Sequence, residues 1–304
     1  MSESAGDHVR TVVFPVAGHG THFLPATKAS PKAMLPVLDK PLIQYAVEEA
    51  VASGAETLIF VTGRTGHAVA DHFDRAVELE HRLQRADRQD LLNITRGTTP
   101  AHVRCLFVRQ PRPLGLGHAV LCARAAVAGE PFAVVLADDL IAATGGRPAL
   151  AQLMDAFSWN RQSVVGVQWV ADARTPEHGM VSVRARDGRL HNIDAIVEKP
   201  ASVDSPSNLG VIGRYVFTPA IFDALERTVP GADGQIQLTD GIARLLETET
   251  VYAYEYAGER FDCGTRLGYL QATVAYALRR PDLRRQARAC LDELRASGRL
   301  QSAG

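Results

Sequence analysis

Hydrophobic residues in the first half of the chain form short runs separated by segments with helical spacing. The runs are rich in β-branched residues, as is typical of buried strands, and cover residues 11–17, 57–63, 102–108 and 131–139. The intervening segments carry apolar residues or a polar periodicity typical of helices, at residues 41–54, 66–92 and 117–127. This alternation predicts right-handed crossovers and a mainly parallel sheet covered by helices on both faces.

The second half of the chain has a different pattern, with apolar and polar residues alternating at period two. Strands of this kind are expected at residues 163–170, 179–199 and 209–218. An Asp-Gly pair at 187–188 predicts a hairpin turn inside the middle segment. A further strand and four helices are expected at residues 250–256, 219–226, 238–247, 265–280 and 281–296. We therefore predict one α/β domain with a β-rich second half continuous with it.

Composition narrows the class of protein without naming an activity. The 304 residues are 46% hydrophobic and carry a formal net charge of −1, which argues against nucleic acid or an anionic membrane as partner. The arginine-rich residues 279–288 fit a solvated helix face better than a nucleic-acid patch. No apolar run reaches the ~18 residues of a membrane span, and the scattered cysteines fit a reducing compartment. We expect a cytoplasmic protein with disorder at residues 1–10 and in the last three residues.

Lysine is scarce in this chain, and its scarcity marks candidate functional positions. Of 33 basic residues only four are lysines, at positions 28, 32, 40 and 199. Lysine is a compact point charge, whereas arginine is a wide planar fork, so a narrow pocket around a phosphate can require lysine. Lys32 and Lys199 are therefore candidates for phosphate contacts, although a surface role for Lys199 is the alternative.

The loop after the first predicted strand, AGHGTHFLPATKASPKAMLP at 17–36, has the glycines that let backbone N–H groups approach an anion. A Walker A loop is excluded, because Lys28 lies between Thr27 and Ala29 instead of following a glycine. A dinucleotide fingerprint is excluded as well, since Phe23 stands where its third glycine is needed. An ordinary strand-to-helix turn stays open as the alternative to a phosphate-binding loop.

Acidic residues at strand ends suggest a metal site. Asp138 and Asp139 follow a predicted buried strand and should point in opposite directions, so that one of them can hold Mg²⁺. Asp262 is a second candidate ligand, or else the N-cap of the helix that follows it. Glu198, beside Lys199, could accept hydrogen bonds from sugar hydroxyls.

Taken together, these motifs resemble the bacterial UTP–glucose-1-phosphate uridylyltransferase family over residues 11–278. The matching segments, in order, are LPATKASPKAMLPVLDKPLIQYAVEEA, LGLGHAVLCA, LADD, VEKP, SNLGVIGRY, QIQLTD and FDCGTRLGYLQATV. The resemblance implies a nucleotide-diphospho-sugar transferase fold: a Rossmann-like, mixed but mainly parallel sheet flanked by helices, with a β-rich sugar-binding second half. It also implies a nucleotidyltransferase domain at 11–278, a C-terminal helix and tail at 279–304, and a homodimer or homotetramer.

The resemblance further implies a transferase for UDP-glucose biosynthesis. Glucose-1-phosphate would attack the α-phosphorus of UTP in line, with Mg²⁺, and pyrophosphate would leave. The residues that match the family's site are assigned by position: Ala17, Gly18, Gln110 and Gly115 to uracil and ribose; Gly20 and Lys32 to the nucleotide phosphates; Asp138 and Asp262 to the metal; Gly179, Glu198 and Gly213 to glucose; and Lys199 to the sugar phosphate.

Four positions depart from the family's usual pattern. His22 stands at an arginine position and is expected to act on the leaving pyrophosphate, and Ala33, Gln235 and His178 replace two glutamates and a tyrosine. These departures support an alternative function, a weakly active or inactive paralogue that binds nucleotide sugar and modulates a partner uridylyltransferase. A different nucleotide, such as dTTP, or a different hexose phosphate is a third alternative.

Overall fold

The computed structural model describes residues 8–231 and 234–297 of the chain. Most of the predicted N-terminal disorder, at residues 1–7, and the last three residues lie outside the described residues. Residues 8–10 are part of the fold, because Val9 is 5% exposed and the carbonyl of Arg10 accepts hydrogen bonds from the N–H groups of Glu56 and Thr57. The predicted disorder is therefore wrong for Val9 and Arg10.

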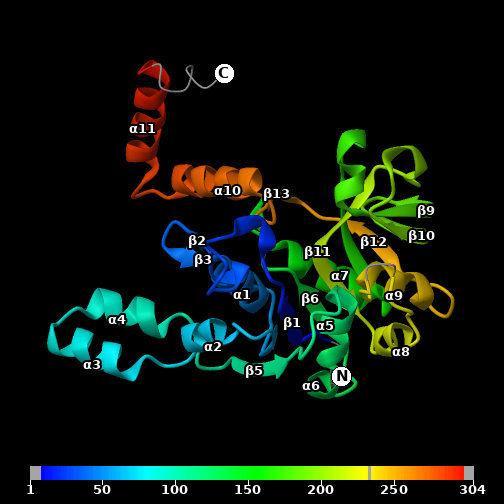
Figure 1. Cartoon of the computed structure of the whole chain (residues 1–304), viewed down its shortest axis with the longest axis horizontal. Coiled ribbons are helices and arrows are strands. Elements are labelled where there is room, and N and C mark those ends of the chain that lie inside the picture. Colours follow the sequence, from blue (N-terminus) through cyan, green and yellow to red (C-terminus); the bar gives the residue numbers. More distant parts are fainter. Residues whose placement is uncertain (1–7, 232–233, 298–304) are drawn as a thin grey trace.

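A nine-stranded mixed sheet forms the centre of the molecule (Figure 1). Its strands, in spatial order, are β5 (Arg104–Arg109), β4 (Thr57–Thr62), β1 (Thr11–Val16), β6 (Phe132–Val135), β11 (Leu209–Phe217), β8 (Val164–Trp169), β12 (Tyr252–Glu255), β10 (Leu190–Glu198) and β9 (Gly179–Asp187). The first four are parallel, as the alternation of strands and helices predicts. In the second half β8 and β12 also pair in parallel, and the other pairs are antiparallel.

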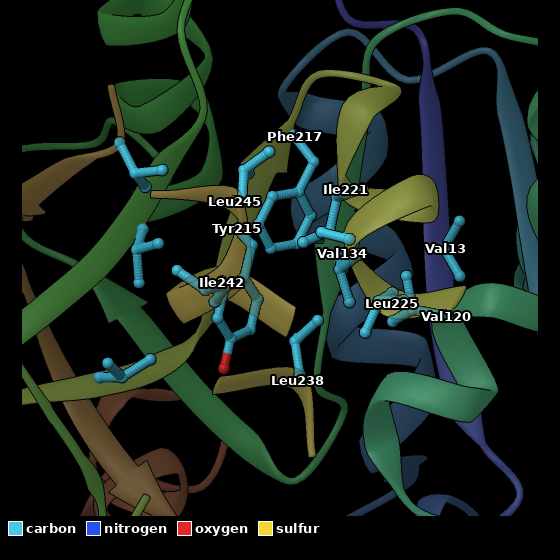
Figure 2. Packing of buried hydrophobic residues seen from close by; sticks show 14 of the residues in the cluster. Val13, Val120, Val134, Tyr215, Phe217, Ile221, Leu225, Leu238, Ile242 and Leu245 are labelled. Atoms are coloured by element: carbon cyan, nitrogen blue, oxygen red, sulfur yellow. The ribbon is translucent and has the colours of Figure 1, made fainter. Parts of the chain in front are cut away.

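Helices cover both faces of this sheet because its strands send alternate side chains to opposite sides. Val12 and Phe14 of β1 belong to a core that includes α1 (Leu42–Ala52), α2 (His67–Phe73) and α7 (Ala149–Asn160). Val13 belongs to the core on the other face. The helices of that face are α5 (Leu116–Cys122), α6 (Arg124–Val127), α8 (Ala220–Glu226) and α9 (Leu238–Leu245). Figure 2 shows Val13 and Val134 of the sheet together with Ile221, Leu225 and Ile242 in this second core.

Two small strand pairs extend the domain beside the central sheet. The antiparallel pair of β7 (Asp139–Ala143) and β13 (Gly258–Asp262) aligns Asp139 with Asp262. The second pair is β2 (Pro36–Val37) with β3 (Lys40–Pro41). A separate apolar cluster, which includes Leu140, Phe261 and Ala272, joins these pairs to α10 (Arg266–Arg279). The last helix, α11 (Arg284–Ala296), has no buried residue and projects from the body (Figure 1).

Several boundaries differ from the sequence-based expectations. The helix predicted at 66–92 is three helices, α2, α3 (Val77–Arg85) and α4 (Gln89–Arg96). The strand predicted at 131–139 ends at Val135, since the chain turns at 136–138 and starts β7. Helix α7 and the strand pair β7–β13 were not predicted. No helix among the described residues is both long and apolar enough to cross a membrane.

Candidate active site

Two adjoining cavities lie at the carboxyl ends of β1, β5 and β6, where ligands bind in open α/β sheets. The first, of about 440 Å³, is lined by the glycine loop that follows β1 and by Gln110 and Gly115. The second, of about 540 Å³, lies over the β-rich half of the domain. Five residues line both cavities: Lys32, Leu116, Leu136, Asp138 and Gln235. The two cavities therefore meet at a lysine and an aspartate.

The first cavity brings together every residue that was predicted to bind the nucleotide: Ala17, Gly18, Gly20, Lys32, Gln110 and Gly115. Gly20 adopts φ 61°, which a non-glycine residue rarely does, and its carbonyl accepts a hydrogen bond from the Thr27 hydroxyl at 2.7 Å. Gly115 adopts φ 98°, and a Cβ there would lie 2.6 Å from the carbonyl oxygen of Ile236. Both glycines are therefore required by the backbone of this cavity.

Lys32 and Asp138 form an ion pair where the cavities meet. Their side chains are 26% and 31% exposed, so an incoming ligand can reach both groups. Burial disfavours the ammonium, but the Asp138 carboxylate outweighs it and raises the pKa of Lys32. Burial likewise opposes the charged form of Asp138, but the Lys32 ammonium lowers the pKa of that carboxyl. Both groups are thus charged at neutral pH.

Asp139 is held by contacts within the protein. Its Oδ2 accepts a hydrogen bond from the Gly213 N–H at 2.7 Å, and its Oδ1 accepts from Nε of Arg260 at 2.7 Å. The side chain is 10% exposed and both of its oxygens are engaged.

Asp262 lies next to Asp138 and is not the N-cap of α10. That cap is Thr265, whose side chain accepts from the Gly268 N–H at 3.1 Å, so the alternative interpretation of Asp262 is wrong. A Cβ on Gly264 would lie 2.8 Å from Oδ1 of Asp262 and 3.5 Å from Oδ2 of Asp138. Burial, followed by the charge of Asp139, raises the pKa of Asp262.

The donor set of this region fits a divalent cation that is shared with a phosphate. No group of three or more His, Cys, Asp or Glu side chains among the described residues is arranged as a complete metal site. Two carboxylates that converge on the space beside Gly264 are the usual protein share of a Mg²⁺ site, because substrate phosphates and water supply the remaining ligands. The residues therefore fit a hard cation bound together with a nucleotide.

Arg214, which is 1% exposed, holds the turn that carries Asp138. Its Nη1 donates to the Leu136 carbonyl at 3.1 Å, and its Nη2 donates to the Asp139 carbonyl at 2.8 Å. Glu49 of α1 neutralises the guanidinium through contacts at 2.7–3.2 Å. One buried guanidinium thus bonds to both ends of the turn at 136–139.

The second cavity brings together all the residues that were predicted to bind the sugar phosphate: Gly179, Glu198, Lys199 and Gly213. A Cβ on Gly179 would lie 2.7 Å from Thr239, and one on Gly213 would lie 2.8 Å from Oδ2 of Asp139. The Glu198 carboxylate accepts from the Thr239 hydroxyl at 2.9 Å, which orients it. Lys199 adopts φ 42° and its side chain is 60% exposed, with Nζ 3.7 Å from Glu198.

The four departures from the family pattern also lie at these cavities. Ala33 lines the first, His22 and His178 line the second, and Gln235 lines both. Nδ1 of His22 lies 3.3 Å from the carbonyl oxygen of Gly264, which also lines the second cavity. Burial, followed by the charge of Arg260, lowers the pKa of His178 to about 4, so this imidazole is neutral at neutral pH.

Sequence reasoning missed Arg214, Thr239 and Arg260. Thr239 could have been found, because it lies in the QIQLTD motif that was used for the family resemblance. Arg214 could have been found in the same way, because it lies in the SNLGVIGRY motif, whereas Arg260 gave no sequence signal in a chain so rich in arginine. Their roles depend on contacts with Glu49 and Asp139, which lie far away in the sequence.

A further hollow of about 690 Å³ lies beyond the opposite end of β1, beside Arg10 and Arg147. Both arginines already pair with acidic side chains, Glu56 and Asp155. This hollow is also remote from the predicted site residues, so the two adjoining cavities are the candidate active site.

Comparison with known proteins agrees with this geometry. The nucleotidyl transferase family model matches residues 13–278. The UTP–glucose-1-phosphate uridylyltransferase of Bacillus subtilis is 46% identical over 279 residues, which cover 91% of this chain and 94% of the relative. The enzyme of the same name from Staphylococcus epidermidis is 44% identical and covers 94% of this chain and 98% of its own.

Solved structures show the same likeness. A UTP-bound UDP-glucose pyrophosphorylase from Acinetobacter baumannii superposes with a TM-score of 0.88 at 41% identity, over 94% of this chain and 99% of that one. A UDP-glucose pyrophosphorylase complexed with UDP-glucose gives a TM-score of 0.81 at 40% identity, over 90% and 100% of the two chains. The predicted fold class is confirmed, and the chain belongs to the nucleotidyl transferase family, within its UTP–glucose-1-phosphate uridylyltransferase group.

Proposed function

We propose that this protein transfers the uridylyl group of UTP to glucose-1-phosphate, giving UDP-glucose and pyrophosphate. One observation carries the proposal: the cavity with the glycine loop and the cavity with Glu198 and Lys199 share Lys32 and Asp138. Relatives that are 40–41% identical have been solved with UTP and with UDP-glucose. The sequence-based alternative of a modulatory, inactive paralogue finds no support in these comparisons.

Each of the two cavities would bind one of the two substrates. In the first, Ala17, Gly18, Gln110 and Gly115 would hold uracil and ribose, and Gly20 would offer its backbone to the phosphates. In the second, Gly179, Glu198 and Gly213 would hold glucose, and Lys199 would pair with the sugar phosphate. A phosphate oxygen of glucose-1-phosphate would then meet the α-phosphorus of UTP at the junction.

The reaction is a substitution at phosphorus, and it makes little covalent demand on the protein. An oxygen of glucose-1-phosphate forms a bond to the α-phosphorus as the bond to the bridging oxygen of pyrophosphate breaks. Catalysis of this kind rests on positioning and on charge neutralisation. The Lys32 ammonium would turn from Asp138 to the phosphates, and His22 would contact the leaving pyrophosphate.

A divalent cation fits this arrangement, and we propose Mg²⁺. Asp138 and Asp262 would hold it, and it would neutralise phosphate charge as the pyrophosphate leaves. Arg214 would keep Asp138 in place through the carbonyls of Leu136 and Asp139. The homodimer or homotetramer, the cytoplasmic location and the division of the chain at residue 278 stay predictions.

A pyrophosphate-release assay with the purified protein tests the function. Turnover should require UTP, glucose-1-phosphate and Mg²⁺ together, and each omission should stop it. Replacing UTP by dTTP, or glucose-1-phosphate by galactose-1-phosphate, tests the alternative specificities. Rapid turnover with dTTP or with galactose-1-phosphate, together with no turnover of UTP and glucose-1-phosphate, would refute the proposal.

A further inference from the structure

Gln110, at the wall of the first cavity, has a side-chain amide whose orientation is fixed. Its Nε2 donates to the Gly115 carbonyl oxygen at 3.1 Å and lies 3.0 Å from Nδ1 of His118. A backbone carbonyl can only accept a hydrogen bond, so the amide nitrogen, and not the amide oxygen, must face Gly115. This contact decides which way round the amide lies.

His118, on the first turn of α5, accepts a hydrogen bond from the second N–H of the Gln110 side-chain amide. Its Nδ1 must accept from Gln110, so the ring proton is carried by Nε2. Burial lowers the pKa of His118, which favours the neutral ring that this contact requires. Cys122, on the next turn of α5, lies with its sulfur 3.8 Å from the same Nδ1.

The amide oxygen of Gln110 is left for a ligand. An amide nitrogen carries two hydrogens, and both are engaged. Within the described part of the chain Oε1 has no hydrogen-bond partner, and it is not one of the unpaired atoms that are sealed from solvent. The first cavity therefore presents an acceptor at this point of its wall.

We propose that His118 is a positioning residue that locks the Gln110 amide with its oxygen toward the cavity, and that this lock selects uracil over cytosine. The ring nitrogen N3 of uracil carries a hydrogen that can bond to Oε1. The N3 of cytosine is an acceptor, so two acceptors would face each other and both would lose their contact with water. Thymine has the same N3–H as uracil, so the lock does not separate these two bases.

The inference rests on the proposed function only in taking the first cavity as the nucleotide site. Isothermal calorimetry tests it without turnover, by comparing the Kd of UTP with that of CTP. A protein that binds both nucleotides as expected but makes no UDP-glucose would refute the proposed function and leave this inference intact. A parent protein that binds the two nucleotides equally would overturn the inference.

Two substitutions of matched shape isolate the lock. His118→Leu removes the acceptor, whereas His118→Asn can place its side-chain oxygen near the position of Nδ1. We expect His118→Leu to reduce the preference for UTP over CTP by about 5- to 10-fold, the worth of roughly one hydrogen bond. His118→Asn should keep most of the preference. Equal weakening of UTP and CTP binding in His118→Leu would mean a merely structural role and would overturn the inference.

Cys122 provides a control for this test, and Gln110 provides a second variant. Cys122→Ala, on the same helix face, should leave the preference unchanged. If His118→Leu does not fold, the preference for UTP over CTP can be measured in Gln110→Met instead, because this substitution removes the amide that His118 positions. An unaltered UTP preference in a folded Gln110→Met variant would overturn the inference.

Discussion

The ammonium of Lys32 and the carboxylate of Asp138 form an ion pair at the point where the two cavities meet. Each partner keeps the other charged despite partial burial, as the directions of their pKa shifts show. The protein therefore holds a positive and a negative group where the proposed reaction joins two phosphates. The consequences of this arrangement can be measured one residue at a time.

Asp138→Ala should lower kcat at least ~100-fold, since one electrostatic contact at a reacting centre of this type is worth ~10²–10³ in rate. The fold should persist, because the side chain is 31% exposed and belongs to no apolar cluster. Pyrophosphate release gives the rate, and circular dichroism with thermal unfolding gives the fold. Asp90→Ala, on the exposed surface of α4, is the control and should not change the rate. An Asp138→Ala protein with more than about a tenth of the parent rate would rule out a metal role for Asp138.

Lys199→Arg should raise KM for glucose-1-phosphate about tenfold or more while leaving KM for UTP nearly unchanged. The substitution keeps the charge, but a planar fork replaces a point charge at a wall of the sugar cavity. Lys40→Arg is the matched control, because Lys40 pairs with Glu48 on the surface and lines neither cavity. Steady-state kinetics of both variants should differ clearly. Identical kinetics would show that the lysine at 199 has no special role.

His22→Arg should raise kcat/KM at pH 7.5 by about tenfold. Arginine keeps its charge at every working pH and could donate two hydrogen bonds to the leaving pyrophosphate. The position is exposed at the rim of the second cavity, so the longer side chain has room. Initial rates with both substrates varied decide the question. An unchanged or lower kcat/KM would mean that His22 does not limit the reaction.

Arg214→Met should destabilise the protein by roughly 3–5 kcal/mol, because it leaves the nearly buried Glu49 without its partner. Urea denaturation measures this loss. The double variant Arg214→Met/Glu49→Gln should recover part of it, since no unpaired charge is then buried. Its kcat should nevertheless stay low, because the turn that carries Asp138 has lost its hydrogen bonds to the guanidinium. Full activity in the stable double variant would show that Arg214 serves stability alone.

The sequence predicted those parts of the fold that rest on local patterns. The runs in β1, β4 and β6 were recognisable because parallel strands buried on both faces are apolar throughout. The pair β7–β13 could not be predicted in the same way, since two five-residue strands meet only after the chain between them has folded. The same difference holds at the site. Lys32 and Lys199 stood out by residue type, whereas Arg214 acts through Glu49, 165 positions away.

The most direct test of the proposed transfer follows the phosphorus atoms of UTP. The purified protein is incubated with glucose-1-phosphate and Mg²⁺, and with UTP radiolabelled at either the α- or the γ-phosphate. In-line attack at the α-phosphorus predicts that α-label enters the nucleotide sugar and that γ-label leaves in pyrophosphate, both at the rate of turnover. The Asp138→Ala protein should move neither label. Release of γ-label as free phosphate, with no α-label in a nucleotide sugar, would contradict uridylyl transfer at the junction of the two cavities.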